Sequence, residues 1–203
     1  MPIYFLEAVS AARAERRPLH IRLLGVFEEN IMEHNVMKSS AVSKMTAVNF
    51  SEMKISQNPA ETLVAFSIGA GIGVTVFDPI SGIGGILNFM LPDSTRANCV
   101  NPEKVPLMFA DTGVPLFINA IIAQGVRPES MKVVIAGGAH IMDQGGAFDI
   151  GQKNIEALKI CLAGYDLQIH HEDVGGITSR TLSLEIGSGC SCIKIFGQGE
   201  VKV

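Results

Sequence analysis

Short apolar blocks, each four to eight residues long and rich in β-branched side chains, follow one another in the first half of the compact part of the chain. They cover residues 48–55, 62–68, 74–78 and 86–91. Pro79 and Pro92 stop the last two blocks, and glycine-rich stretches separate the blocks from one another. The pattern predicts a series of strands joined by tight turns.

The second half adds two segments with helical periodicity. Residues 106–124 have apolar positions three and four apart and end near Gly125, and Pro115 marks either the true start of this helix or a kink. Residues 150–162 form an amphipathic helix with Ile155, Leu158 and Leu162 on one face. Further strands are predicted at 131–136, 167–173, 181–186 and 192–196, the last two as a hairpin. This order favours α+β layers over a doubly wound parallel sheet.

The first 45 residues differ from the rest, with a dense charge cluster at residues 13–17 and few apolar runs. We therefore expect an N-terminal extension at 1–45 and one compact domain at 46–203. Two interpretations of the extension stay open. Either it is a flexible or helical arm, or Met45 is the native start and the upstream segment does not occur in the native protein.

Composition excludes several function classes. The net charge is −4 without a basic stripe, which speaks against nucleic-acid binding, and no uncharged apolar run reaches the 18 residues typical of a membrane span. The charges follow the first apolar stretch, the reverse of a signal peptide. Four cysteines in 203 residues do not suggest a disulfide scaffold, so we expect free thiols, a cytoplasmic location and no metal or cofactor.

Residue types alone assemble no catalytic site. The glycines at 69–73 lack the spacing of a phosphate loop and precede a strand instead of a helix. His170 and His171 point to opposite faces of a predicted strand, and His140, at a strand end, is a lone histidine. Cys190 and Cys192 are too close in sequence for a CxxC pair and are expected on one strand face. The residue types by themselves therefore indicate an α+β domain and no specific activity.

Seven motifs nevertheless resemble the CheD family of chemoreceptor glutamine deamidases, in the family's order and over about residues 48–203. They lie at 68–79, 82–94, 109–118, 133–139, 148–154, 172–176 and 179–184. The first two read IGAGIGVTVFDP and GIGGILNFMLPDS, and the sixth reads EDVGG. The resemblance implies a single-domain, layered α/β/β sandwich.

The resemblance also implies a cysteine nucleophile, a histidine that activates it and a threonine that holds the histidine ring. The flanking motifs place these three positions on Gly71, Asn88 and Ala65, so all three are replaced. Ser67 is predicted to share the strand face of residue 65, but a serine without a base is a poor nucleophile. Cys99 is a remote substitute, with no histidine predictably beside it.

We therefore expect a catalytically degenerate deamidase that acts as a binding or regulatory partner of chemoreceptors or of a CheC-type phosphatase. Met142 and Phe148 are candidate partner contacts, although Phe148 packing under the next helix is an equal alternative. The main alternative function is an active deamidase with relocated residues, converting glutamine to glutamate and ammonia. A small-ligand module that uses the vacated site is a third possibility.

Overall fold

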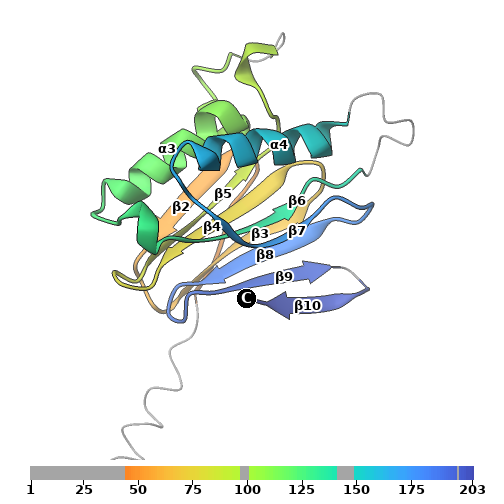
Figure 1. Cartoon of the computed structure of the whole chain (residues 1–203). Helices are drawn as coiled ribbons and strands as arrows, with labels where there is room; N and C mark the ends of the chain where they lie inside the picture. Colours follow the sequence, from red (N-terminus) through yellow and green to blue (C-terminus); the bar gives the residue numbers. More distant parts are fainter. Residues whose placement is uncertain (1–43, 97–100, 141–148, 196) are drawn as a thin grey trace, which may run out of the picture. The chain divides into compact units, whose positions relative to one another are not determined.

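The computed structural model describes residues 44–96, 101–140, 149–195 and 197–203. Within these residues, two five-stranded mixed sheets pack face to face, and helices α3 (Ala110–Ile122) and α4 (Ile150–Ala163) cover the free face of one of them (Figure 1). We call the helix-covered sheet the central sheet and the other the outer sheet. The arrangement confirms the predicted α+β class and the layered α/β/β sandwich.

The central sheet has the strand order β2-β5-β4-β6-β7. Its strands are β2 (Glu52–Ser56), β5 (Ile83–Phe89), β4 (Ile72–Asp78), β6 (Lys132–Gly137) and β7 (Ile169–Val174). Neighbours pair antiparallel except β6 and β7, which are parallel. That parallel pair requires a long crossover, and α4 (Ile150–Ala163) lies within it.

The outer sheet has the order β1-β3-β8-β9-β10. Its strands are β1 (Lys44–Ala47), β3 (Glu61–Ile68), β8 (Arg180–Glu185), β9 (Cys190–Ile195) and β10 (Gly199–Lys202). The antiparallel β8–β9 pair is the hairpin predicted from the sequence, whereas β10 was not predicted. The strand predicted at 48–55 begins too early, because β2 starts only at Glu52 in the central sheet; β1, which ends at Ala47 in the outer sheet, was not predicted.

Helix α3 spans Ala110–Ile122 and contains Pro115, so the alternative in which Pro115 starts the helix is wrong. Residues 106–109 are not part of the helix, because Pro106–Met108 form a 3-10 turn. Two further 3-10 turns lie at Ser94–Arg96 and Pro128–Ser130. Helix α4 agrees with its prediction, and the Asp149 side chain caps it by accepting from the Gln152 N–H at 3.3 Å.

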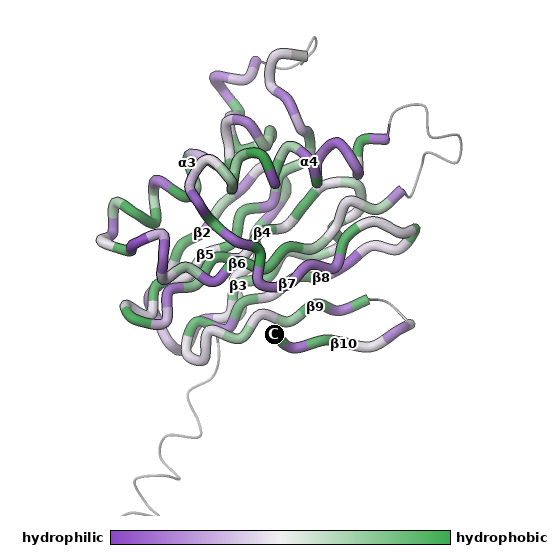
Figure 2. The backbone as a smooth tube through the Cα atoms, in the orientation of Figure 1, coloured by the Kyte–Doolittle hydropathy of each residue, from purple (hydrophilic) through white to green (hydrophobic). Residues whose placement is uncertain are grey.

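Two hydrophobic clusters hold the layers together, one on each face of the central sheet. One joins α3 and α4 to outward residues of the central strands, such as Val74 and Leu87. The other lies between the sheets and joins Ile86 of β5 to Ala65 of β3. Strands β4 and β5 are buried along their whole length, and Figure 2 shows hydrophobic colour along the central strands against alternating colours on the helices. These two strands therefore form the rigid base of the fold.

Strand β1 contains Lys44 and Met45, so the predicted boundary between extension and domain passes through this strand. The extension itself lies almost entirely outside the described residues. Within the described ranges, no helix has the length and apolar character needed to cross a membrane.

Asp78 fixes the turn between β4 and β5. Its buried carboxylate accepts from the backbone N–H of Ile80 at 3.1 Å and of Ser81 at 3.0 Å, and from the Ser81 hydroxyl at 2.6 Å. Burial by itself would raise the pKa of this carboxyl, but the hydrogen bonds from Ser81 and Ile80 outweigh it and hold the pKa below its ordinary value. The ionised form is therefore the one that stabilises the fold.

We expect Asp78→Asn to lower the free energy of unfolding at neutral pH by about 1–3 kcal/mol, because the charge-assisted bonds to the turn are weakened. A carboxyl whose folded pKa is depressed contributes stability above its unfolded pKa and loses it as pH falls through the folded pKa. The variant should therefore lose less stability than the wild type on acidification, measured by urea unfolding at neutral and acidic pH. Exposed Glu129→Gln is the control, and an equal effect there would contradict the assignment.

Candidate functional site

The three positions to which the resemblance assigns catalytic residues lie at one end of the sandwich. Asn88 is the sixth residue of β5, two residues after Ile86 of the inter-sheet cluster, so its side chain points between the sheets. Ala65 lies on the inner face of β3 in the same cluster. Gly71 directly precedes β4, which pairs with β5 so that Ile72 lies opposite Phe89. The fold thus brings together the positions that the sequence motifs selected.

Gly71 is packed against the end of β5 too closely for a side chain. A Cβ atom built there would lie 2.5 Å from the carbonyl oxygen of Phe89 and 3.5 Å from the Cα of Met90. Real Cβ atoms do not approach a backbone oxygen so closely, and a backbone oxygen moves only if its strand moves. Glycine at 71 therefore allows the start of β4 to approach the end of β5 closely.

The strand ends on both sides of Gly71 are tied to their neighbours. The Gly71 carbonyl accepts from the Gly138 N–H at 2.8 Å. Buried Asn154 of α4 donates through Nδ2 to the carbonyls of Ala70 and Met90, both at 2.8 Å. Asn154 was not among the predicted site residues; its only signal in the sequence was membership of the motif at 148–154. This carboxamide joins the start of β4 to the end of β5.

Asn88 is only 1% exposed, and its Oδ1 has no hydrogen-bond partner among the described residues. Its backbone carbonyl accepts from the Ser51 N–H at 2.8 Å, which fixes the strand end. A carboxamide donates and accepts hydrogen bonds but does not take up a proton near neutral pH. The side chain in the histidine position therefore lacks the property that a general base needs.

The prediction that Ser67 shares a strand face with residue 65 is wrong. The pairing of β3 with β8 shifts register between Ala65 and Ile68, which marks a β-bulge. Ser67 adopts a positive φ of 54° and is exposed, whereas Ala65 is buried. The bulge turns the serine hydroxyl away from the inter-sheet space.

Other candidate residues do not join this site. Cys99, Met142 and Phe148 lie outside the described residues. His140 contacts Asp149, with Nδ1 and Oδ1 3.1 Å apart, at the base of the segment that leads to α4. His170 is exposed on β7 and its Nδ1 accepts from the Val133 N–H at 3.2 Å. In the described ranges, no three His, Cys, Asp or Glu side chains are placed to hold a metal ion.

Cys190 and Cys192 lie on one face of β9, as predicted, and both are free and partly exposed. Ser191 between them points inward, and its hydroxyl lies 2.9 Å from that of Thr75. Burial raises the pKa of the Cys192 thiol, with a further contribution from Glu200, and burial also raises that of Cys161. Neither thiol has the lowered pKa that marks a reactive cysteine.

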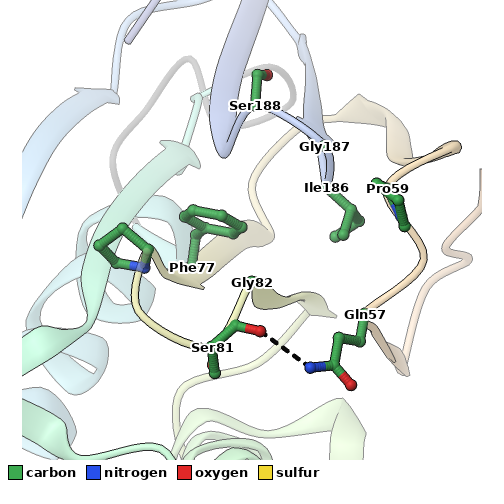
Figure 3. Close-up of a pocket in the computed structure, with 9 residues that line it drawn as sticks. Gln57, Pro59, Phe77, Ser81, Gly82, Ile186, Gly187 and Ser188 are labelled. Atoms are coloured by element: carbon green, nitrogen blue, oxygen red, sulfur yellow. Dashed lines mark hydrogen bonds between the residues drawn. The ribbon is translucent and has the colours of Figure 1, made fainter. Parts of the chain in front are cut away.

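A cavity of about 480 Å³ lies at the opposite end of the sandwich, where three turns from the two sheets meet (Figure 3). Gln57 closes one side by donating from Nε2 to the carbonyl of Ser81 at 2.9 Å. The lining residues are Gln57, Pro59, Phe77, Pro79, Ser81, Gly82, Ile186, Gly187 and Ser188. None of the three family positions contributes to it.

Comparison with known proteins identifies the family. Residues 90–195 match the model of the family described as "CheD chemotactic sensory transduction". A "Probable chemoreceptor glutamine deamidase CheD 1" of Syntrophus aciditrophicus is 39% identical over 150 residues, which cover 74% of this chain and 93% of that protein. A relative in Solibacter usitatus, "Probable chemoreceptor glutamine deamidase CheD", is 39% identical over 142 residues, covering 70% of this chain and 83% of that protein.

The relative in Symbiobacterium thermophilum, with the same name, is 32% identical over 160 residues, covering 77% of this chain and 96% of that protein. Among solved structures, a hypothetical protein YfiH of Bacillus licheniformis aligns with 59% of this chain and 49% of its own length, at 14% identity and a TM-score of 0.36. That likeness is too slight to bear on function. The sequence relatives and the family match show that this chain belongs to the CheD family.

Proposed function

We propose that this CheD-family protein binds a chemoreceptor without deamidating it and so acts as a regulatory partner in chemotaxis. The observation that carries the proposal is the packing of Gly71, whose missing Cβ would lie 2.5 Å from the Phe89 carbonyl oxygen. The position matched to the family's nucleophile thus has no side chain, and one could be added only if the ends of β4 and β5 moved apart. The buried amide of Asn88 beside it supplies no base.

Deamidation by the route that the family resemblance implies needs a nucleophile and a base acting as one unit. A thiolate attacks the carbon of the glutamine side-chain amide, ammonia leaves with a proton from the base, and water cleaves the thioester to give glutamate. Removal of such a unit costs on the order of a millionfold in rate. Replacement at Ala65, Gly71 and Asn88 together therefore supports abandoned catalysis and not merely a slower enzyme.

The proposed partner comes from the relatives, which are named as probable chemoreceptor glutamine deamidases. A protein that keeps their scaffold but not the chemistry can still occupy a receptor or compete with an active deamidase. A CheC-type phosphatase is the other partner that the family resemblance implies. Contacts through Met142 and Phe148, and the cytoplasmic location, belong to the same proposal.

The test combines binding and chemistry in one sample. The full chain is incubated with the purified cytoplasmic fragment of a chemoreceptor from the same organism, binding is measured by calorimetry, and glutamine-to-glutamate conversion is followed by peptide mass spectrometry. We expect binding without conversion, and an active CheD relative serves as the positive control. Conversion by the wild-type chain that disappears in Cys99→Ser would contradict the proposal and support the alternative of relocated catalytic residues.

A further inference from the structure

Strand β10 is an open edge of the outer sheet. It pairs with β9 on one side and is the last strand of its sheet in the described part of the chain (Figure 1). All its residues, Gly199–Lys202, are exposed. An edge strand presents backbone N–H and C=O groups with which another strand can pair, and most proteins block such edges. The residues of this edge therefore decide what can pair with it.

The hydrogen bonds to β9 fix which backbone groups of the edge are free. Val203 and Ser191 exchange both of their backbone bonds, at 2.8 and 3.0 Å. Residue pairs along an antiparallel ladder alternate between hydrogen-bonded and non-hydrogen-bonded, so Val201 also directs its N–H and C=O toward β9. Glu200 and Lys202 direct theirs to the free side. A strand that adds to this edge must therefore bond to the backbone of these two residues.

The side chains of the edge are divided between the two faces of the sheet. Val201 lies opposite Ile193, a member of the cluster between the sheets, so Val201 and Val203 point to the inner face. These two valines are nevertheless 48% and 42% exposed. Glu200 and Lys202 point to the outer face. The edge thus carries an uncovered apolar pair on one face and two opposite charges on the other.

The two charges have no partner within the described part of the chain. Neither Glu200 nor Lys202 forms an ion pair or a side-chain hydrogen bond with another described residue, although Lys194 lies opposite Glu200 on β9. The edge strand β2 of the central sheet shows the contrast. Its Glu52 and Lys54 have the same spacing, but the Lys54 Nζ donates to Glu52 at 2.5 Å. The charges of β10 are therefore available to a partner, whereas those of β2 are not.

We propose that β10 is the surface through which two copies of this chain pair, antiparallel and about a two-fold axis at Val201. In this register Glu200 lies opposite Lys202 of the partner subunit, and the symmetry repeats the pair. Both residues then also exchange their free backbone bonds. A register shifted by two residues would satisfy the backbone too, but it would place glutamate opposite glutamate or lysine opposite lysine. The charges therefore select a single register.

The same register covers the exposed valines. Val201 lies opposite its own copy as a non-hydrogen-bonded pair, the type in which the Cα atoms are closer, at about 4.5 Å. Val203 lies opposite Gly199 of the partner subunit, which has no side chain to obstruct it. A lone edge lysine keeps other strands away, but a glutamate two residues before it makes this edge complementary to itself. The pairing joins the two outer sheets into one continuous sheet.

Charge reversal tests the register. Sedimentation equilibrium of the full chain, at concentrations up to about 1 mM because so short an interface belongs to the weak class, is expected to show monomer and dimer. Glu200→Lys and Lys202→Glu should each weaken dimerisation by about tenfold or more, since each turns both cross-strand pairs into like charges. The double variant, and an equimolar mixture of the two single variants, restore opposite charges and should dimerise like the wild type. Glu129→Lys makes the same charge change at an exposed site outside the edge and should alter the affinity by less than about twofold.

Introduced cysteines test the geometry. Val201→Cys places two thiols at the two-fold axis, with Cα atoms about 4.5 Å apart and within the range of a disulfide. Val203→Cys is the matched control, because the two copies of that residue would lie about 14 Å apart along the ladder. Only the first variant is expected to form a covalent dimer on mild oxidation. Peptide mass spectrometry distinguishes this disulfide from any formed by the free Cys161, Cys190 and Cys192.

Each outcome bears on the proposal. A wild type that stays monomeric throughout the concentration range overturns it, and so does a dimer that withstands both charge reversals, since that dimer uses another surface. Equal cross-linking of the two cysteine variants contradicts the register. Hydrogen exchange covers the other occupant: if the N–H groups of Glu200 and Lys202 are protected by the receptor fragment but not by a rise in protein concentration, the edge takes an extended receptor segment and not a second copy. None of the dimer measurements involves a chemoreceptor, so the proposed function is tested separately.

Discussion

A variant that carries Ala65→Thr, Gly71→Cys and Asn88→His is expected to deamidate a chemoreceptor glutamine, whereas the wild type and the three single variants are not. The gain should be on the order of a thousandfold or more over the single variants, because nucleophile and base act as a unit and neither is effective alone. Ammonia release and the glutamine-to-glutamate mass change on the receptor fragment measure it.

The three substitutions restore the roles that the family resemblance assigns to these positions. Cysteine at 71 supplies the thiolate, and histidine at 88 takes the thiol proton and returns a proton to the leaving ammonia. Threonine at 65 lies on the inner face of β3, in the cluster that contains Ile86 on the same face of β5 as residue 88. It can therefore orient the imidazole from the opposite sheet.

The restored cysteine carries a structural cost. Its Cβ would begin 2.5 Å from the Phe89 carbonyl oxygen, so the ends of β4 and β5 must separate by several tenths of an ångström. We expect Gly71→Cys to lower the free energy of unfolding by about 1–3 kcal/mol, the range for overpacked sites. Gly164→Ala is the matched control, because Gly164 has a φ of −62° and its nearest neighbour would lie 3.2 Å from the Cβ. Urea unfolding compares the two.

Two readings decide the result. A count of reactive thiols one higher than that of the wild type, which already has free cysteines at 161, 190 and 192, shows that residue 71 is accessible. Circular dichroism shows that the fold persists. A folded variant with an accessible thiol but no deamidation would contradict the placement of the catalytic positions on Ala65, Gly71 and Asn88.

Much of this architecture follows from local pattern. The strands predicted at 62–68, 74–78 and 86–91 and the helix at 150–162 agree with β3, β4, β5 and α4 to within three residues. Burial on both faces leaves a short continuous apolar run between turn residues, and burial along one stripe of a helix leaves a helical period. The register of Gly71 and Asn88 was set by prolines and glycines at fixed distances in the motifs. The structure places Gly71 directly before β4 and Asn88 near the end of β5, its pairing partner.

What the sequence did not reveal depends on contacts between distant segments. The break between Ala47 and Glu52 arises because β1 pairs with β3 and β2 pairs with β5, in different sheets, and no local pattern encodes that choice. The bulge that exposes Phe66 and Ser67 is likewise visible only in the pairing with β8. Asn154 looked like any polar residue of an amphipathic helix until α4 was seen to meet the carbonyls of Ala70 and Met90.

Arg180 joins the two sheets at the end of the sandwich that carries Gly71 and Asn88. Its side chain is 8% exposed, and Nη2 and Nε donate to Oδ1 of Asp173 at 2.8 and 3.2 Å. Nη1 donates to the carbonyls of Gly175 and Thr178, the latter at 2.8 Å. The guanidinium on β8 of the outer sheet thus satisfies both a carboxylate on β7 of the central sheet and the turn between the two strands.

We expect Arg180→Ala to lower the free energy of unfolding by about 3 kcal/mol, which is the lower end of the range for a broken buried ion pair. The lower end applies because the Asp173 side chain is 25% exposed and therefore partly hydrated. Arg180→Lys should recover less than half of the loss, since an ammonium does not reproduce the planar set of donors. Lys159→Ala is the control. It breaks the ion pair between Lys159 of α4 and Glu172, which lies on β7 next to Asp173. The side chains of this pair are 45% and 42% exposed, so its loss should cost less than about 1 kcal/mol. Urea unfolding of the three variants measures these differences. If Arg180→Ala costs no more than Lys159→Ala, the guanidinium does not hold the sheets together, and the stability of the site end must come from the apolar layer between them.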